Sequence, residues 1–324
     1  MKLAPWLMPA WNVFAADLRE GRLHHALLFA SPRGYGKRAL VDALATSALC
    51  RQRAEDGSAC GTCRSCVLVA AGSHPDLVRV TFEPRESDGK LRTELIVDQM
   101  RALAQRLAMS SQFGGLQIAI VDPADAMNPN AANALLKTLE EPAADTIIML
   151  VADDPSRLPA TIRSRCRRID MLVPTRAEAL AWLREKGVRD DIAVAVLDAS
   201  MDNPGLAEGW IEEGALDLRA ECIADLSALS ASRVQVSAVA ERWAADRPGL
   251  RLWFASALAR EEARRIGAGR CGELGLTERT EIPKLAAWFG RANRARGLLL
   301  TPLRADLVLV DLLRDWPART AGRA

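Results

Sequence analysis

The stretch ALLFASPRGYGKR, residues 26–38, decides the fold. Its first five residues are apolar, which is typical of a buried parallel strand. The residues that follow place Leu40, Val41 and Leu44 on one face of a helix that we expect over 38–50. A strand, a glycine-containing turn and a helix in this order form the setting of a phosphate-binding loop, in which backbone N–H groups and the helix N-terminus face an anion.

The loop departs from the phosphate-binding pattern G-x-x-x-x-G-K-[ST] at two positions. Ser31 stands where the first glycine belongs, and Arg38 replaces the hydroxyl residue that holds Mg²⁺. Gly34, Gly36 and Lys37 are therefore candidate nucleotide-binding residues of a degenerate loop, which we expect to be non-productive. The alternative is a strand–turn–helix whose glycines only make the turn.

A second strand also indicates that ATP hydrolysis is lost. Residues 118–122, IAIVD, form an apolar run that ends in an acid, the layout of a Walker B strand. In an active ATPase of this kind a glutamate normally follows and polarises the attacking water, whereas Pro123 has no group that does so. Asp125 lies three residues beyond Asp122, too far along the chain to be taken as a substitute. We therefore expect no hydrolysis by the isolated chain.

Strand-like and helix-like stretches alternate from residue 25 to about residue 173. Strands are expected at 26–30, 77–82, 117–121, 146–151 and 168–172, and helices at 38–50, at 94–108 and from Pro129 to Pro142, with Asn128 as N-cap. This alternation predicts an α/β domain with a parallel five-stranded sheet covered by helices on both faces.

Beyond Pro174 the strand signals fade. Short helices are expected at 175–187 and 192–200, and amphipathic helices over 209–316, with breaks near Pro248, residues 267–275 and Pro302 and a frayed tail at 318–324. The chain is thus predicted to contain an α/β domain (1–173), a small helical domain (174–208) and an all-α domain (209–324).

Composition excludes several classes of protein. The 324 residues are 49% hydrophobic and 26% charged, with a net charge of +2, which excludes a generally polybasic nucleic-acid coat. The first twelve residues do not resemble a signal peptide, and no apolar run approaches the ~20 residues that cross a bilayer. We expect a cytoplasmic protein with no membrane partner.

Four of the seven cysteines are closely spaced. The pattern C-x9-C-x2-C-x2-C comprises Cys50, Cys60, Cys63 and Cys66. Four thiolates at this spacing suit a tetrahedral, structural Zn²⁺ with no open position, in a module inserted at about 50–66. Free thiols and an iron–sulfur cluster are the alternatives.

Further strings carry a family resemblance. Residues 131–142, AANALLKTLEEP, and 161–166, TIRSRC, resemble the corresponding motifs of AAA+ clamp-loader subunits of bacterial DNA polymerase III, as do HPDL at 74–77 and the position of the cysteine module. The resemblance is strong over residues 22–172 and weaker in the C-terminal helices. Within that family the ATP-hydrolysing gamma/tau subunits keep an intact loop and a Walker B glutamate, which this chain lacks.

The resemblance implies a function carried out in an assembly. Clamp loaders are rings of five subunits with ATP at the interfaces, where a neighbour's Ser-Arg-Cys arginine completes each site. Arg165, flanked by Ser164 and Cys166, is implied to be such an arginine finger acting in trans. The alternative is that Arg163, Arg165, Arg167 and Arg168 form a solvated basic edge or contact DNA phosphates.

The resemblance also implies a domain plan and partners. The α/β domain is expected to be AAA+-like, residues 174–208 a lid, and residues 209–324 an oligomerising collar. The expected partners are the delta and gamma/tau subunits and, through the complex, the sliding clamp and primed DNA, so that the chain is a non-hydrolysing component of the polymerase holoenzyme. The competing readings are an active gamma/tau-type ATPase and a zinc-dependent nucleic-acid enzyme, which requires an open metal position.

Overall fold

The computed structural model describes residues 3–274, 276, 279, 281–299, 301 and 303–317. The chain divides into two compact units, Met1–Glu178 and Ala179–Ala324. Three sequence expectations lie outside the described residues: the tail at 318–324, the break at Pro302 and the end of the break at Gly275.

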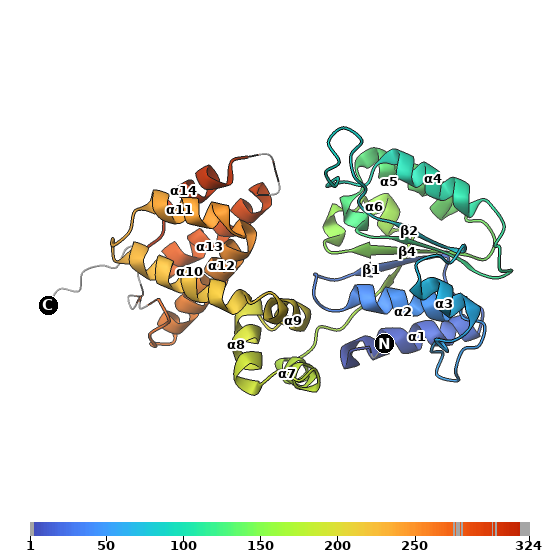
Figure 1. The fold of residues 1–324 in the computed structure, drawn as a ribbon, viewed down its shortest axis with the longest axis horizontal. Helices are drawn as coiled ribbons and strands as arrows, with labels where there is room; N and C mark the ends of the chain where they lie inside the picture. The colour runs from blue at the N-terminus through green and yellow to red at the C-terminus, as the bar shows by residue number, and fades with distance from the viewer. Residues whose placement is uncertain are drawn as a thin grey trace. The chain divides into compact units, whose positions relative to one another are not determined.

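A five-stranded, wholly parallel sheet organises the first unit, as the sequence predicts (Figure 1). Its strands are β1 (Ala26–Ala30), β2 (Leu77–Val80), β3 (Gln117–Val121), β4 (Thr146–Ala152) and β5 (Arg167–Ile169), in the spatial order β2-β3-β4-β1-β5. Every residue of β1, β3 and β4 is buried, which explains why these strands are continuous apolar runs.

Two strands are shorter than expected. The predicted ends at Phe82 and Leu172 are wrong, because β2 ends at Val80 and β5 at Ile169. Strand β5 pairs only with Leu27–Phe29 of β1, and Leu172 beyond it is largely exposed. An apolar run at a sheet edge therefore does not extend the strand where no partner continues.

Helices cover both faces of the sheet (Figure 1). One face carries α1 (Met8–Arg19), α2 (Lys37–Leu49) and α3 (Arg64–Ala70), and the other carries α4 (Val97–Leu107), α5 (Pro129–Glu140) and α6 (Ala160–Arg163), with three short 3₁₀ turns at Pro5–Leu7, Ala124–Ala126 and Pro155–Arg157. Helix α5 begins as expected, since Asn128 Oδ1 accepts the Ala131 N–H at 2.9 Å. Helix α1 was not predicted, although its buried residues follow helical spacing: Ala10, Trp11, Phe14 and Ala15.

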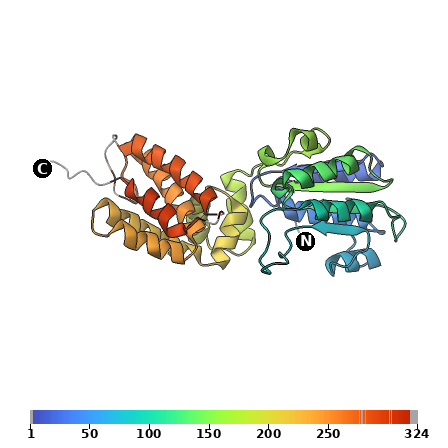
Figure 2. The ribbon, with the colours of Figure 1, turned by 90° about the horizontal axis from the view of Figure 1, so that it is seen from above.

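From Arg176 onward the described chain is helical (Figures 1 and 2). The helices are α7 (Arg176–Glu185), α8 (Asp190–Ser200), α9 (Pro204–Glu212), α10 (Ala215–Ser230), α11 (Val236–Ala245), α12 (Pro248–Gly267), α13 (Glu281–Leu298) and α14 (Ala305–Arg314). Their apolar faces share one core, in which the Trp288 and Trp316 rings meet edge to face at 4.7 Å. The subdivision near residue 208 stays a prediction. None of the helices in the described ranges is both long enough and apolar enough to cross a bilayer.

Candidate functional site

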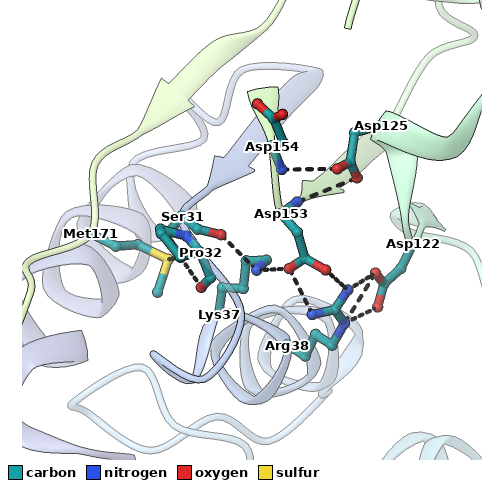
Figure 3. Close-up of polar contacts among 9 residues, drawn as sticks. All are labelled: Ser31, Pro32, Lys37, Arg38, Asp122, Asp125, Asp153, Asp154 and Met171. Atoms are coloured by element: carbon teal, nitrogen blue, oxygen red, sulfur yellow. Dashed lines mark hydrogen bonds and ion pairs between the residues drawn. The ribbon is translucent and has the colours of Figure 1, made fainter. Parts of the chain in front are cut away.

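Three segments distant in sequence meet at one edge of the sheet. Strands β3, β4 and β1 are neighbours and run parallel, so their carboxyl ends lie side by side. These ends lead into Asp122, Asp153 and the loop at 31–37, respectively. Ligands of open parallel sheets bind at this edge, and Figure 3 shows the polar side chains gathered there.

Lys37 is held inside the loop. Its side chain is 1% exposed, and Nζ donates to the Ser31 carbonyl at 2.7 Å and pairs with the Asp153 carboxylate (Figure 3). Burial holds the pKa of Lys37 below its ordinary value, although Asp153 opposes this shift. The lysine of the loop is therefore already engaged with the chain itself.

Arg38 bridges the two acids at the strand ends. Its Nε lies 2.8 Å from Asp122 Oδ2, and one terminal nitrogen lies 2.8 Å from Asp122 Oδ1. The other terminal nitrogen lies 3.0 Å from Asp153 Oδ1. Burial opposes the charges, but the hydrogen bonds outweigh it, so that the pKa of Arg38 is raised and the pKa of Asp153 is lowered.

Asp125 has a structural task. The residue is 8% exposed, and its carboxylate accepts the backbone N–H of Asp153 at 3.3 Å and of Asp154 at 2.8 Å (Figure 3). Both oxygens are thus occupied in holding the end of β4. This fits the expectation that Asp125 does not substitute for the water-polarising residue that is missing at Pro123.

The residues at this edge do not fit Mg²⁺–nucleotide. The metal needs oxygen ligands, and the loop hydroxyl that normally supplies one is replaced by Arg38, which also covers both oxygens of Asp122. The backbone conformation explains the two glycines without any ligand. The angle φ is 96° at Gly34 and 85° at Gly36, and a Cβ at Gly36 would lie 2.9 Å from Leu7 Cδ1. Nucleotide binding by Gly34, Gly36 and Lys37 stays a prediction.

The four cysteines converge between α2 and α3. The sulfur–sulfur distances are 3.6 Å for Cys50–Cys60, 3.9 Å for Cys50–Cys63, 4.0 Å for Cys60–Cys66 and 3.5 Å for Cys63–Cys66. An ion with tetrahedral bonds of about 2.3 Å places its sulfurs about 3.8 Å apart. All four sulfurs lie within 4.8 Å of one another, so the residues fit a tetrahedral metal ion.

Backbone donors support the negative charge of this cluster unevenly. The N–H groups of Cys63 and Thr62 lower the pKa of Cys60 to about 6. Burial, together with the neighbouring Cys63 thiol, raises the pKa of Cys66 to about 12. A metal ion bound by the four sulfurs would supply the missing stabilisation for the buried thiolate.

The HPD motif joins the cysteine module to the sheet. The Asp76 carboxylate accepts hydrogen bonds from Ser111 Oγ and from the N–H groups of Gln112 and Phe113, at 2.8–2.9 Å. The Phe113 ring in turn receives the guanidinium groups of two module residues, Arg51 and Arg64, at 5.5 and 5.3 Å from its centroid. The motif therefore positions the module on the loop before β3.

The Ser-Arg-Cys motif lies just before β5. One terminal nitrogen of Arg165 donates to the Thr161 carbonyl at 2.9 Å, and the other pairs with Glu140 at the end of α5. Ser164 Oγ donates to the same carbonyl at 3.2 Å, and burial raises the pKa of Cys166 to about 11. Strands β5 and β1 are parallel, so the amino end of β5 lies beside the amino end of β1. The loop at 31–37 follows the carboxyl end of β1, so Arg165 does not contact this chain's own loop.

Sequence reasoning missed Asp153 and Glu140. Asp153 follows a buried apolar strand, which is the signal that identified Asp122, so the same rule applied to β4 finds it. Glu140 lies within the string at 131–142, but nothing in its spacing indicates a pair with Arg165, 25 residues later.

The chain resembles known proteins both in sequence and in fold. Residues 7–174 match the family model described as DNA polymerase III, delta subunit. The chain is 37% identical over 254 residues to the DNA polymerase III subunit delta' of Pseudomonas aeruginosa, covering 77% of this chain and 74% of that protein. It is 39% identical over 208 residues to the subunit delta' of Escherichia coli, covering 64% and 60%. A gamma subunit-related protein of Thermotoga maritima shares the fold, with a TM-score of 0.50, 16% identity and coverage of 96% and 99%.

Proposed function

The chain belongs to the delta' family of DNA polymerase III subunits, and we propose that it serves as a non-hydrolysing subunit of a clamp loader. In this role it assembles with delta and gamma/tau subunits, and the complex places a sliding clamp on primed DNA. Residues 1–173 act as the AAA+-like domain, residues 174–208 as a lid and residues 209–324 as a collar. Cys50, Cys60, Cys63 and Cys66 hold a structural Zn²⁺, whose chemistry is confined to cross-linking the module.

The absence of hydrolysis rests on two positions. Arg38 supplies no hydroxyl to a metal, and Pro123 supplies no carboxylate to a water molecule. The isolated chain should release phosphate from ATP no faster than buffer does. Steady turnover that Lys37→Ala abolishes would support instead the alternative, an active gamma/tau-type ATPase.

The arginine-finger role rests chiefly on one observation, the placement of Arg165 and the loop at opposite edges of the sheet. An arginine so placed serves a neighbour's site rather than its own. Its resting pair with Glu140 is partly solvated, with side-chain exposures of 35% and 48%. Such pairs contribute about 0–1 kcal/mol, so leaving Glu140 costs little compared with the charge that a guanidinium stabilises on a phosphoryl group.

The test is Arg165→Ala in reconstituted complexes of matched composition. Arginine fingers contribute roughly 10³–10⁵ in rate at the site they serve. Because one interface of several is affected, DNA- and clamp-stimulated ATPase activity should fall by less than this. Arg165→Lys should restore little, since an ammonium lacks the planar fork.

Two variants make the test specific. Arg163→Ala removes an exposed arginine two residues away and should leave ATPase activity unchanged. Glu140→Ala removes the resting partner but keeps the fork, so activity should not fall as it does for Arg165→Ala. Wild-type activity of the Arg165→Ala complex, with assembly verified by mass, would remove the finger assignment.

A further inference from the structure

Two acids at the loop edge of the sheet are paired with cations of the chain itself. Two carboxylates, Asp122 and Asp153, face two cations, Lys37 and Arg38, within one hydrogen-bonded group (Figure 3). Two further acids lie nearby: Asp125 accepts two backbone N–H groups, and Asp154 accepts the N–H and the hydroxyl of Ser156. The positive charge that Asp122 and Asp153 require is thus supplied by the chain.

The two cations differ in how securely they hold their charge. Burial lowers the pKa of Lys37, whereas the guanidinium of Arg38 stays charged at any pH at which the protein folds. Arg38 is also the residue whose planar fork contacts both acids. It follows the loop directly, at the position from which a hydroxyl side chain helps to hold Mg²⁺ in nucleotide-hydrolysing loops.

We propose that Arg38 is a built-in cation that takes the place of a divalent metal between the ends of β3 and β4. Its guanidinium joins the first turn of α2 to Asp122 and Asp153, so the edge is held together without nucleotide or Mg²⁺. A divalent ion gains access to Asp122 only after this fork has been broken. The inference deepens the proposed function, because it concerns the same degenerate loop, but it stands on side-chain geometry.

The first experiment measures thermal unfolding of the full, zinc-saturated chain with and without millimolar Mg²⁺, with no chelator present. The wild-type midpoint should not depend on Mg²⁺. Arg38→Thr leaves two neighbouring carboxylates facing Lys37 alone and should lower the midpoint by about 5 °C, of which Mg²⁺ should restore a part. Arg38→Lys keeps a charge but not the fork, so it should be destabilised without any response to Mg²⁺.

A matched control is Arg79→Thr, which removes an arginine of β2 whose ion pair with Asp42 spans 2.7 Å and is about half exposed. Its midpoint should change by no more than about 2 °C and should ignore Mg²⁺. This control separates the loss of any surface ion pair from the loss of the bridge.

The second experiment titrates the same proteins with a fluorescent ADP analogue. Mg²⁺ should not tighten binding to the wild type and should tighten it in Arg38→Thr, because Asp122 and a hydroxyl become available together. Tighter wild-type binding with Mg²⁺, or an Arg38→Thr protein as stable as the wild type and unresponsive to Mg²⁺, would overturn the proposal. Either result comes from the isolated chain and leaves the trans role of Arg165, measured in complexes, standing.

Discussion

Helix α2 has a different kind of charged site at each of its ends. At its start, Lys37 and Arg38 neutralise Asp122 and Asp153 with bonds made wholly within the chain. Past its end, Cys50 joins three other cysteines whose sulfurs face one another at 3.5–4.0 Å. The first site supplies its own cations, whereas the second fits a metal ion. The comparison separates a site whose carboxylates are paired with cations of the chain from a site whose four thiol groups fit a metal ion.

The largest expected effect is at the cysteine end. Zinc binding to such sites contributes on the order of 10–16 kcal/mol at neutral pH, so Cys63→Ser should unfold the module and lower the melting midpoint strongly. Elemental analysis should find one zinc per wild-type chain. Cys271→Ser, at an exposed cysteine outside the cluster, should keep both metal and midpoint. A wild-type protein without metal would contradict the proposed difference between the two ends of α2.

An intermediate effect is expected at the start of α2, where backbone and side-chain donors of the chain itself bind the carboxylates. Asp125→Ala leaves the N–H groups of Asp153 and Asp154 without their acceptor and should cost about 1–3 kcal/mol in urea unfolding. Asp98→Ala, which removes a largely exposed carboxylate in α4, should cost less than about 0.5 kcal/mol. Equal stabilities of the two variants would show that the end of β4 is held in another way.

The smallest expected effect is a difference between the two sites in how they respond to low pH. The pKa of Asp153 is lowered in the folded chain, so its contribution is present at neutral pH and is lost as the pH falls below its ordinary value of about 4. The stability difference between the wild type and Asp153→Asn should thus be constant from pH 7 to about pH 5 and shrink below about pH 4. Zinc release, followed with a chelating dye, should begin at a higher pH, because protons compete for thiolates. The reverse order would contradict the assignment of fixed cations to one site and a bound cation to the other.

Local patterns in the sequence were enough to predict much of the fold. Buried apolar runs located β1, β3 and β4, and a single asparagine, Asn128, located the start of α5. Spacing was also enough to bring four cysteines together within one short insertion.

The contacts that the sequence did not predict join residues far apart in the chain. Arg38 and Asp122 are 84 residues apart, and Arg38 and Asp153 are 115 apart. The sequence shows that Arg38 cannot act as a hydroxyl, but what it does instead depends on which strands are neighbours in the sheet. The end of β5 was misplaced for the same reason, since strand length is set by pairing with β1 as well as by hydrophobicity.

The placement of Arg165 and the loop at opposite sheet edges has a consequence for how copies of this fold can be ordered. The surface that carries Arg165 differs from the surface that carries the loop, so subunits that use both associate head to tail. A symmetric dimer would bring identical surfaces together and could not pair one with the other. If Arg165 serves a neighbour's site, as proposed, and Arg38 neutralises the loop of this chain, then the chain gives an arginine to a neighbour and needs none in return. A series of subunits joined by such contacts would then have a direction, and this chain would stand at one end of it.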